Sequence, residues 1–306
     1  MNDSRNPLAA GLFALVRHRR LAAVLWLASL VALLPALASL ARFARRWDEG
    51  PFRETILAGW DGWAVLSWLA FNPGEASTFQ AAALVSVSLG AFLHLFLVPG
   101  LLRTIATDVN RPVLRRVVAE SAALFRPNLW GFSRYLLTLA FWEGLLVALP
   151  VAAIAAAGKH VEAPPNGPLA NLSLAWGVVV GTVVFLNVSA RWSMARVALA
   201  LDDSPTARGA YRVAKRRLSG GRLAAIGIAL FWFALGLALQ AGFTRAGVAL
   251  NPSTGRGVLG LVLFRQAGFL LLAATRVGYW ASLLAFERRR RPRPAAPAAS
   301  RVEARA

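Results

Sequence analysis

The stretch that decides the fold is residues 80–102, QAAALVSVSLGAFLHLFLVPGLL, an apolar run that contains no Asp, Glu, Lys or Arg. A helix of about 20 apolar residues crosses the roughly 30 Å hydrocarbon core of a bilayer, because each residue adds about 1.5 Å. Runs of this length and purity are typical of transmembrane helices. The sequence therefore predicts a membrane span here.

Five more runs of the same kind stand on either side of it. The whole chain is 57% hydrophobic and only 16% charged, with a mean hydropathy of +0.54, a balance that soluble domains of this size rarely show. A signal peptide at the first run is disfavoured by its length and by the runs that follow. We predict an all-α polytopic transmembrane helix bundle with spans at about 21–41, 80–102, 133–157, 169–190, 222–243 and 257–286.

The positive charges indicate the orientation of this bundle. Most of the 34 Lys and Arg residues lie before the first span, after the second, after the fourth and after the sixth. Positive residues stay on the cytoplasmic side, so both termini are expected in the cytoplasm. We predict a multi-pass protein of the bacterial inner membrane, with a single domain at 1–287. The basic, Pro- and Ala-rich segment 288–306 is expected to be a disordered tail.

The connections are expected to form helices that lie flat on the membrane. The outer connection 42–79 is rich in tryptophan, which predicts a surface helix at 51–70; a re-entrant lid is the alternative. The inner connections 103–132 and 191–221 each combine a capping residue, a proline and an amphipathic stretch. In the second, the residues expected to contact anionic phospholipid head groups are Arg208, Arg212, Lys215, Arg216 and Arg217.

Several function classes are excluded or disfavoured. The net charge of +20 would suit a nucleic-acid partner, but its placement between apolar runs suits membrane orientation instead. The chain has no Cys, and its three His residues lie far apart, so no metal site and no cofactor is expected. No nucleophile with a base, carboxylate pair or phosphate-binding glycine loop is present, which predicts a protein that is not an enzyme.

Polar residues inside the spans are the candidate site. Ionisable groups there cost about 2.5–3.5 kcal/mol each on insertion scales, so they are expected to face the bundle interior. His94, Glu143 and Arg276 are predicted at similar depth, and Arg265 shares a helix face with Arg276. This cluster could line an anion pathway. Alternatively, Glu143 and Arg276 form a structural ion pair, and Arg265 reaches the head groups.

One part of the sequence resembles a known group. The motif runs from Arg191-Trp192-Ser193-Met194 through Asp202-Asp203-Ser204-Pro205 to Leu218-Ser219-Gly220-Gly221. It resembles an uncharacterised family of bacterial six-span membrane proteins, and is similar to the membrane domain attached to some glycerophosphodiester phosphodiesterases. The resemblance implies the fold but no catalytic residue, because those membrane regions are not themselves the hydrolase.

Two functions remain open from the sequence. The first is a non-enzymatic membrane organiser that binds anionic lipid and a protein partner or a second copy of itself. The alternative is a transporter of a small anionic solute or a lipid. A water-filled route through the His94, Glu143 and Arg276 level would distinguish the second from the first.

Overall fold

The computed structural model describes residues 6–47, 73–107, 114–160, 167–202, 206–249 and 255–290, and within them it contains helices and no strand. The predicted surface helix at 51–70 and the tail beyond residue 290 lie outside the described residues. The helices are α1 (Pro7–Arg17), α2 (Arg19–Trp47), α5 (Pro73–Ala106), α6 (Leu114–Glu143), the π-helix η1 (Gly144–Ala148), α7 (Leu149–His160), α8 (Pro168–Ala200), α9 (Ala207–Leu218), α10 (Arg222–Ala249) and α11 (Gly255–Arg290).

Six helical stretches in the described ranges are long and apolar enough to cross a membrane, which confirms the all-α, six-span prediction. They are Arg19–Ser39, Ala76–Ala106, Leu114–Ala157, Asn171–Ala200, Arg222–Gly247 and Val262–Arg290. The last of these is the central helix of the fold. It buries 61% of its most apolar window, a larger share than any other span among them.

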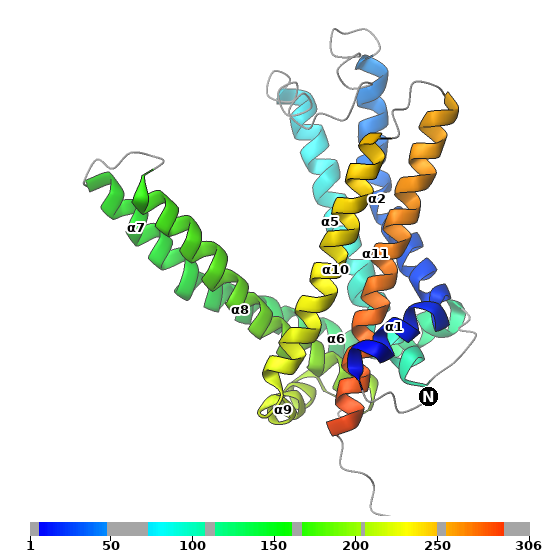
Figure 1. The fold of residues 1–306 in the computed structure, drawn as a ribbon, viewed down its shortest axis with the longest axis vertical. Coiled ribbons are helices and arrows are strands. Elements are labelled where there is room, and N and C mark those ends of the chain that lie inside the picture. Colours follow the sequence, from blue (N-terminus) through cyan, green and yellow to red (C-terminus); the bar gives the residue numbers. More distant parts are fainter. Residues whose placement is uncertain are drawn as a thin grey trace, which may run out of the picture.

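The spans form two groups that meet at one end of the molecule. Helices α2, α5, α10 and α11 run side by side, while α7 and the outer half of α8 pair with each other and lead away from them (Figure 1). The main core lies where the groups meet, at the end that carries α9. Val98 and Leu101 of α5, Val197 of α8 and Leu284 of α11 are all buried there.

Helix α1 was not predicted from the sequence. Asn6 caps it by accepting a hydrogen bond from the Leu8 N–H at 2.9 Å, and Pro7 occupies the first turn. The helix packs on α11, and a Cβ placed on Gly11 would come within 2.6 Å of the Gly278 carbonyl oxygen. Its other side exposes Val16, which is 77% accessible. An amphipathic helix of this kind suits a membrane surface.

The two inner connections differ from the prediction and from each other. The first does not form a separate flat helix in its described part, because α6 begins at Leu114 and continues through Pro127 into the third span. The second does form a helix, α9. Its N-cap is Thr206, which follows Pro205 in the sequence, and the Thr206 side chain accepts a hydrogen bond from the Gly209 N–H at 3.1 Å. The apolar side of α9 is buried against α8 rather than exposed to lipid.

Three residues expected in the basic tail, 288–290, are helical. Helix α11 continues to Arg290, so residues 288–290 belong to the folded domain. Arg288 donates to the Ala106 carbonyl at the end of α5, and Arg290 donates to the Gly220 carbonyl beyond the end of α9 at 2.7 Å. Cationic side chains at helix C-termini satisfy unpaired carbonyls and complement the helix dipole. These arginines therefore hold the inner ends of three helices together.

Candidate functional site

A cavity of about 800 Å³ lies within the four-helix group. Its walls come from α2, α5, α10 and α11, and its polar lining includes His94, Gln240, Arg276 and Tyr279. Arg276 stands midway along the span Val262–Arg290, and its side chain is exposed although its helix is the most buried span of the described residues. Arg276 is therefore an exposed cation in the lining of this cavity, midway along its span.

The cavity has an amphipathic lining. Ser29 and Ser86 add two hydroxyl groups, while Leu33, Val87 and Phe269 contribute part of an apolar wall. None of the described lining residues is acidic. A cation inside a membrane is costly unless a partner or water compensates it. An anionic group would supply that compensation at Arg276, and apolar walls would accept a hydrocarbon chain.

Two interactions fix the helices that enclose this cavity. Ser86 of α5 accepts a hydrogen bond from the Ala36 N–H of α2 at 3.0 Å, next to Pro35. Trp26 of α2 donates through its indole nitrogen to the Gln266 side chain of α11 at 3.1 Å. Buried hydrogen bonds between transmembrane helices contribute about 0.6 to 2 kcal/mol each. They hold α2 against both neighbours while leaving Arg276 free to face the cavity.

A second hollow, of about 270 Å³, lies on the other side of His94 and Trp280. It is lined by residues of α5, α6, α8 and α11, and Arg196 is its cation. The Arg196 guanidinium carbon lies 5.8 Å from the centre of the Phe132 ring, a cation–π arrangement. His94 lines both hollows, one together with Arg276 and the other together with Arg196. The two hollows together place a histidine between two guanidinium groups.

Arg196 was not predicted as a site residue. The fourth span was expected to end near residue 190, so Arg196 was counted with the cytoplasmic connection. The structure continues α8 to Ala200 and places Arg196 against α5 and α6. The apolar residues on both sides of it, Met194, Ala195, Val197 and Ala198, were the signal that could have shown the longer helix.

The predicted cluster of four intramembrane residues is only partly brought together. His94 and Arg276 line the same cavity. Glu143 lies at the end of α6, where a Cβ on Gly181 of α8 would be 3.4 Å from its carboxylate, and no ion pair joins it to Arg276 in the described structure. Arg265 is exposed and does not line the cavity. Glu143 is separated because the third and fourth spans lead away from the α11 group (Figure 1).

The five basic residues predicted on the second connection divide into two kinds. Arg208, Arg212, Lys215 and Arg216 are exposed on α9. Arg217 instead forms an ion pair with Glu287 of α11, whose side chain is only 1% accessible. A buried carboxylate needs a cation close by. Arg217 is therefore part of the internal structure rather than a simple lipid contact.

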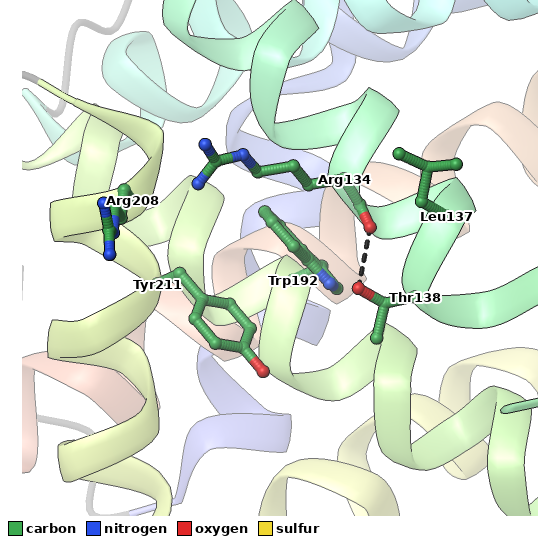
Figure 2. Close-up of a pocket in the computed structure, with 6 residues that line it drawn as sticks. All are labelled: Arg134, Leu137, Thr138, Trp192, Arg208 and Tyr211. Atoms are coloured by element: carbon green, nitrogen blue, oxygen red, sulfur yellow. Dashed lines mark hydrogen bonds between the residues drawn. The ribbon is translucent and has the colours of Figure 1, made fainter. Parts of the chain in front are cut away.

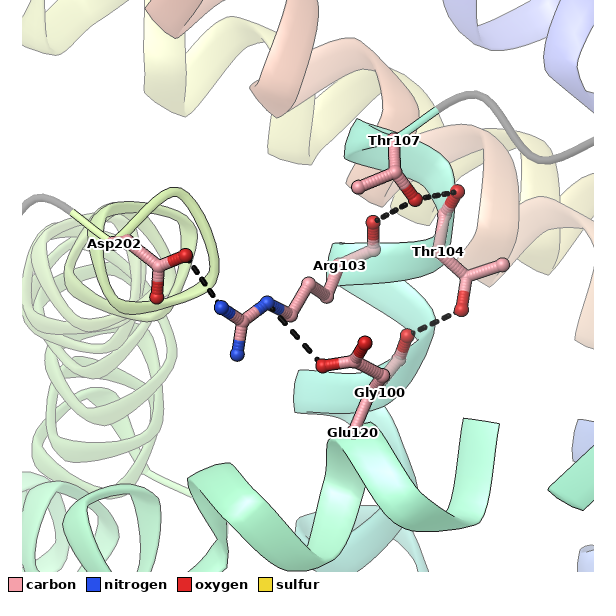
Figure 3. Close-up of polar contacts among 6 residues, drawn as sticks. All are labelled: Gly100, Arg103, Thr104, Thr107, Glu120 and Asp202. Atoms are coloured by element: carbon pink, nitrogen blue, oxygen red, sulfur yellow. Dashed lines mark hydrogen bonds and ion pairs between the residues drawn. The ribbon is translucent and has the colours of Figure 1, made fainter. Parts of the chain in front are cut away.

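A second polar cluster, also missed from the sequence, joins α5, α6 and the end of α8 near the end of the molecule that carries α9 (Figure 3). Arg103 of α5 lies 3.3 Å from the Glu120 carboxylate of α6 and also pairs with Asp202, which follows α8. Asp202 has a φ of 57°, a left-handed conformation that Asp tolerates better than most residues. The two carboxylates satisfy Arg103, so this cluster is structural and has no free cation for a ligand.

The central cavity, the one of about 800 Å³, offers groups that can bind an anion. Arg276 and His94 can hold an anion, and no described group of three or more His, Asp or Glu side chains could hold a metal ion. Comparisons with protein-family models, curated proteins and solved structures return no match.

Proposed function

We propose that this chain is a multi-pass protein of the bacterial inner membrane that binds and transports an anionic amphiphile. The single observation that carries the proposal is the cavity of about 800 Å³ in which Arg276 and His94 face apolar walls without a described carboxylate. An anionic head group would bind the guanidinium, and a hydrocarbon chain would lie along α2 and α5. The protein does this without chemistry on the ligand.

The orientation is part of the same proposal. One end of the molecule carries α9, the Arg103 cluster and the arginines at the end of α11, and by the positive-inside rule this charge supports a cytoplasmic location for that end. Both described ends of the chain, α1 and the end of α11, lie near it (Figure 1). The cavity would then lie between the two leaflets.

Dodecyl phosphate binding tests this function, with purified full-length protein and radiolabelled ligand. Arg276→Gln should weaken binding at least about tenfold, because a hydrogen bond to a charged group contributes about 1.5–3 kcal/mol and 1.4 kcal/mol is a factor of ten. Arg265→Gln is the matched control, since it removes the same charge from the same helix outside the cavity. Equal loss in both variants, or in neither, would contradict the proposal.

The organiser function remains a second candidate because of α9. Its exposed basic side chains would attract the anionic inner leaflet, or an acidic protein partner, with about 1 kcal/mol per residue near the surface. Replacing Arg208, Arg212, Lys215 and Arg216 by Gln should then abolish the salt-sensitive association of the detergent-solubilised protein with anionic vesicles. Unchanged association would remove this candidate and leave the cavity function intact.

A further inference from the structure

A third hollow, of about 260 Å³, lies where α6, α8 and α9 meet, away from the central cavity. Figure 2 shows the Trp192 ring between Arg134 of α6 and Tyr211 of α9, with Arg208 on the α9 side. Leu137 and Thr138 of α6 complete the described lining. The hollow therefore opens at the inner end of the molecule, beside the exposed basic face of α9.

The charge of this hollow is unbalanced. Arg134 and Arg208 contribute two guanidinium groups from different helices, and none of the described lining residues is acidic. The Arg103 cluster, by contrast, provides two carboxylates for one arginine. The Thr138 hydroxyl is already engaged, because it donates to the Arg134 carbonyl oxygen at 2.8 Å. Two guanidinium groups without a carboxylate in the described lining suit a phosphate, which accepts several charge-assisted hydrogen bonds.

Trp192 forms a rigid wall of the hollow. Its side chain is 7% accessible, and its indole Nε1–H has no hydrogen-bond partner within the described structure. A buried donor without a partner loses its hydration and gains nothing in return. The Trp192 ring is held firmly, with its centre 4.8 Å from that of Tyr211 and 6.5 Å from that of Tyr135. The indole nitrogen itself is covered by neighbouring atoms, so Trp192 contributes a fixed aromatic wall to the hollow rather than a hydrogen bond to the ligand.

We propose that this hollow binds the phosphate of an anionic phospholipid from the inner leaflet. The surface next to it favours a lipid over free phosphate, because Leu137 at its edge is 71% accessible and Phe141, one turn further along α6, is also exposed. Acyl chains can follow this apolar face into the membrane while the head group stays at Arg134 and Arg208. The site ties α6 to α9 through the lipid, independently of the central cavity.

Lipid retention measured by native mass spectrometry tests the site. Full-length protein is loaded with phosphatidylglycerol or phosphatidylcholine and washed with detergent. The number of lipid molecules that remain bound to each protein is then measured. Wild type should retain one phosphatidylglycerol, and Arg134→Gln/Arg208→Gln should weaken its binding by about tenfold or more, since charge-assisted hydrogen bonds are lost. Trp192→Phe keeps an aromatic wall and removes only the covered N–H, so it should retain phosphatidylglycerol like wild type.

The matched control is Arg115→Gln/Arg116→Gln, which removes two exposed arginines from the same helix α6 without touching the hollow. This control should retain phosphatidylglycerol like wild type. Equal loss in both double variants would show only general surface attraction and would overturn the proposal, as would equal retention of both lipids by wild type. Displacement of the lipid by millimolar inorganic phosphate would identify a free-anion site instead. The loss caused by Arg134→Gln/Arg208→Gln should persist when Arg276→Gln is also present, which separates this site from the central cavity.

Discussion

Arginine occupies three different environments in this protein, and each follows from the neighbouring atoms. Arg276 faces a cavity with no described carboxylate, Arg103 lies between two carboxylates, and Arg290 donates to carbonyl groups at the end of another helix. The guanidinium group presents five donors in a rigid plane, so it can cap a helix as well as bind an anion. The partner, rather than the residue type, decides which role each arginine has.

Two substitutions separate the contribution that the backbone conformation of Asp202 makes to stability from the contribution of its charge. Asp202→Asn removes the ion pair with Arg103 and should cost about 1 kcal/mol, because the pair is partly exposed. Asp202→Ala should cost about 1 kcal/mol more, since Ala tolerates the left-handed φ of 57° less well than Asn. Thermal unfolding in detergent measures both. Equal stability of the two variants would show that the backbone conformation contributes nothing.

A larger loss of stability is predicted when the buried Glu287 carboxylate loses its partner. Arg217→Ala leaves this 1%-accessible carboxylate without its cation, which should cost about 3 kcal/mol or more. The double variant Arg217→Ala/Glu287→Leu should recover much of that loss, because the uncompensated charge is gone. Unfolding in a denaturant series gives the coupling between the two sites. An additive double variant would mean that the pair does not interact.

The sequence was sufficient to place His94 and Arg276 inside the membrane, because depth follows from counting residues along a helix. It could not show that Glu143 and Arg276 are apart. Residues at the same depth can face different directions, and only the packing of whole helices decides which of them meet. Arg196 was missed for a simpler reason, the early end assigned to the fourth span.

At the scale of elements, capping signals predicted helix α9 but not what its apolar side contacts. Ala210, Ala214 and Leu218 alternate with basic residues, which is typical of a membrane-surface helix and equally of a helix packed on a protein. In the structure α9 is a helix packed on the protein, against α8. Local pattern also could not show that α6 runs unbroken through Pro127, because a proline is tolerated in spans that neighbouring helices support.

Close contact between α5 and α6 depends on Gly100. A Cβ there would lie 2.3 Å from the Val117 carbonyl oxygen, so Gly100→Ala must push the helices apart and should cost about 1–3 kcal/mol. Gly227→Ala in α10 is the matched control, because nothing lies within 4 Å of its added Cβ. The unfolding temperatures of the two variants in detergent are compared. A Gly100→Ala variant as stable as Gly227→Ala would contradict the packing of these two helices.

For the whole molecule, the number of spans was predictable because the bilayer sets a minimum length for each apolar helix. The arrangement of the spans was not. Nothing in the hydropathy shows that α7 and the outer half of α8 lead away from the other spans, or that α11 is the central helix. The cavity depends on that arrangement, so it could not be located from the sequence.

The proposed orientation predicts opposite labelling at the two ends of the molecule. The chain has no Cys, so single substitutions can be probed without background. Ser77→Cys, exposed near the start of α5, should react with an impermeant thiol reagent in intact spheroplasts. Ser219→Cys, exposed at the end of α9, should react only after permeabilisation. The reverse pattern would invert the topology.

Water access to the central cavity is the most direct test of anion binding there. It can be measured at two positions on α2. Ser29→Cys lines the cavity and leaves Arg276 and His94 intact, whereas Leu27→Cys is exposed on the same helix outside the cavity. An impermeant thiol reagent should label Ser29→Cys and not Leu27→Cys, and dodecyl phosphate should slow that labelling unless Arg276→Gln is also present. Equal labelling of the two positions, or protection that persists without Arg276, would contradict an anion-binding cavity.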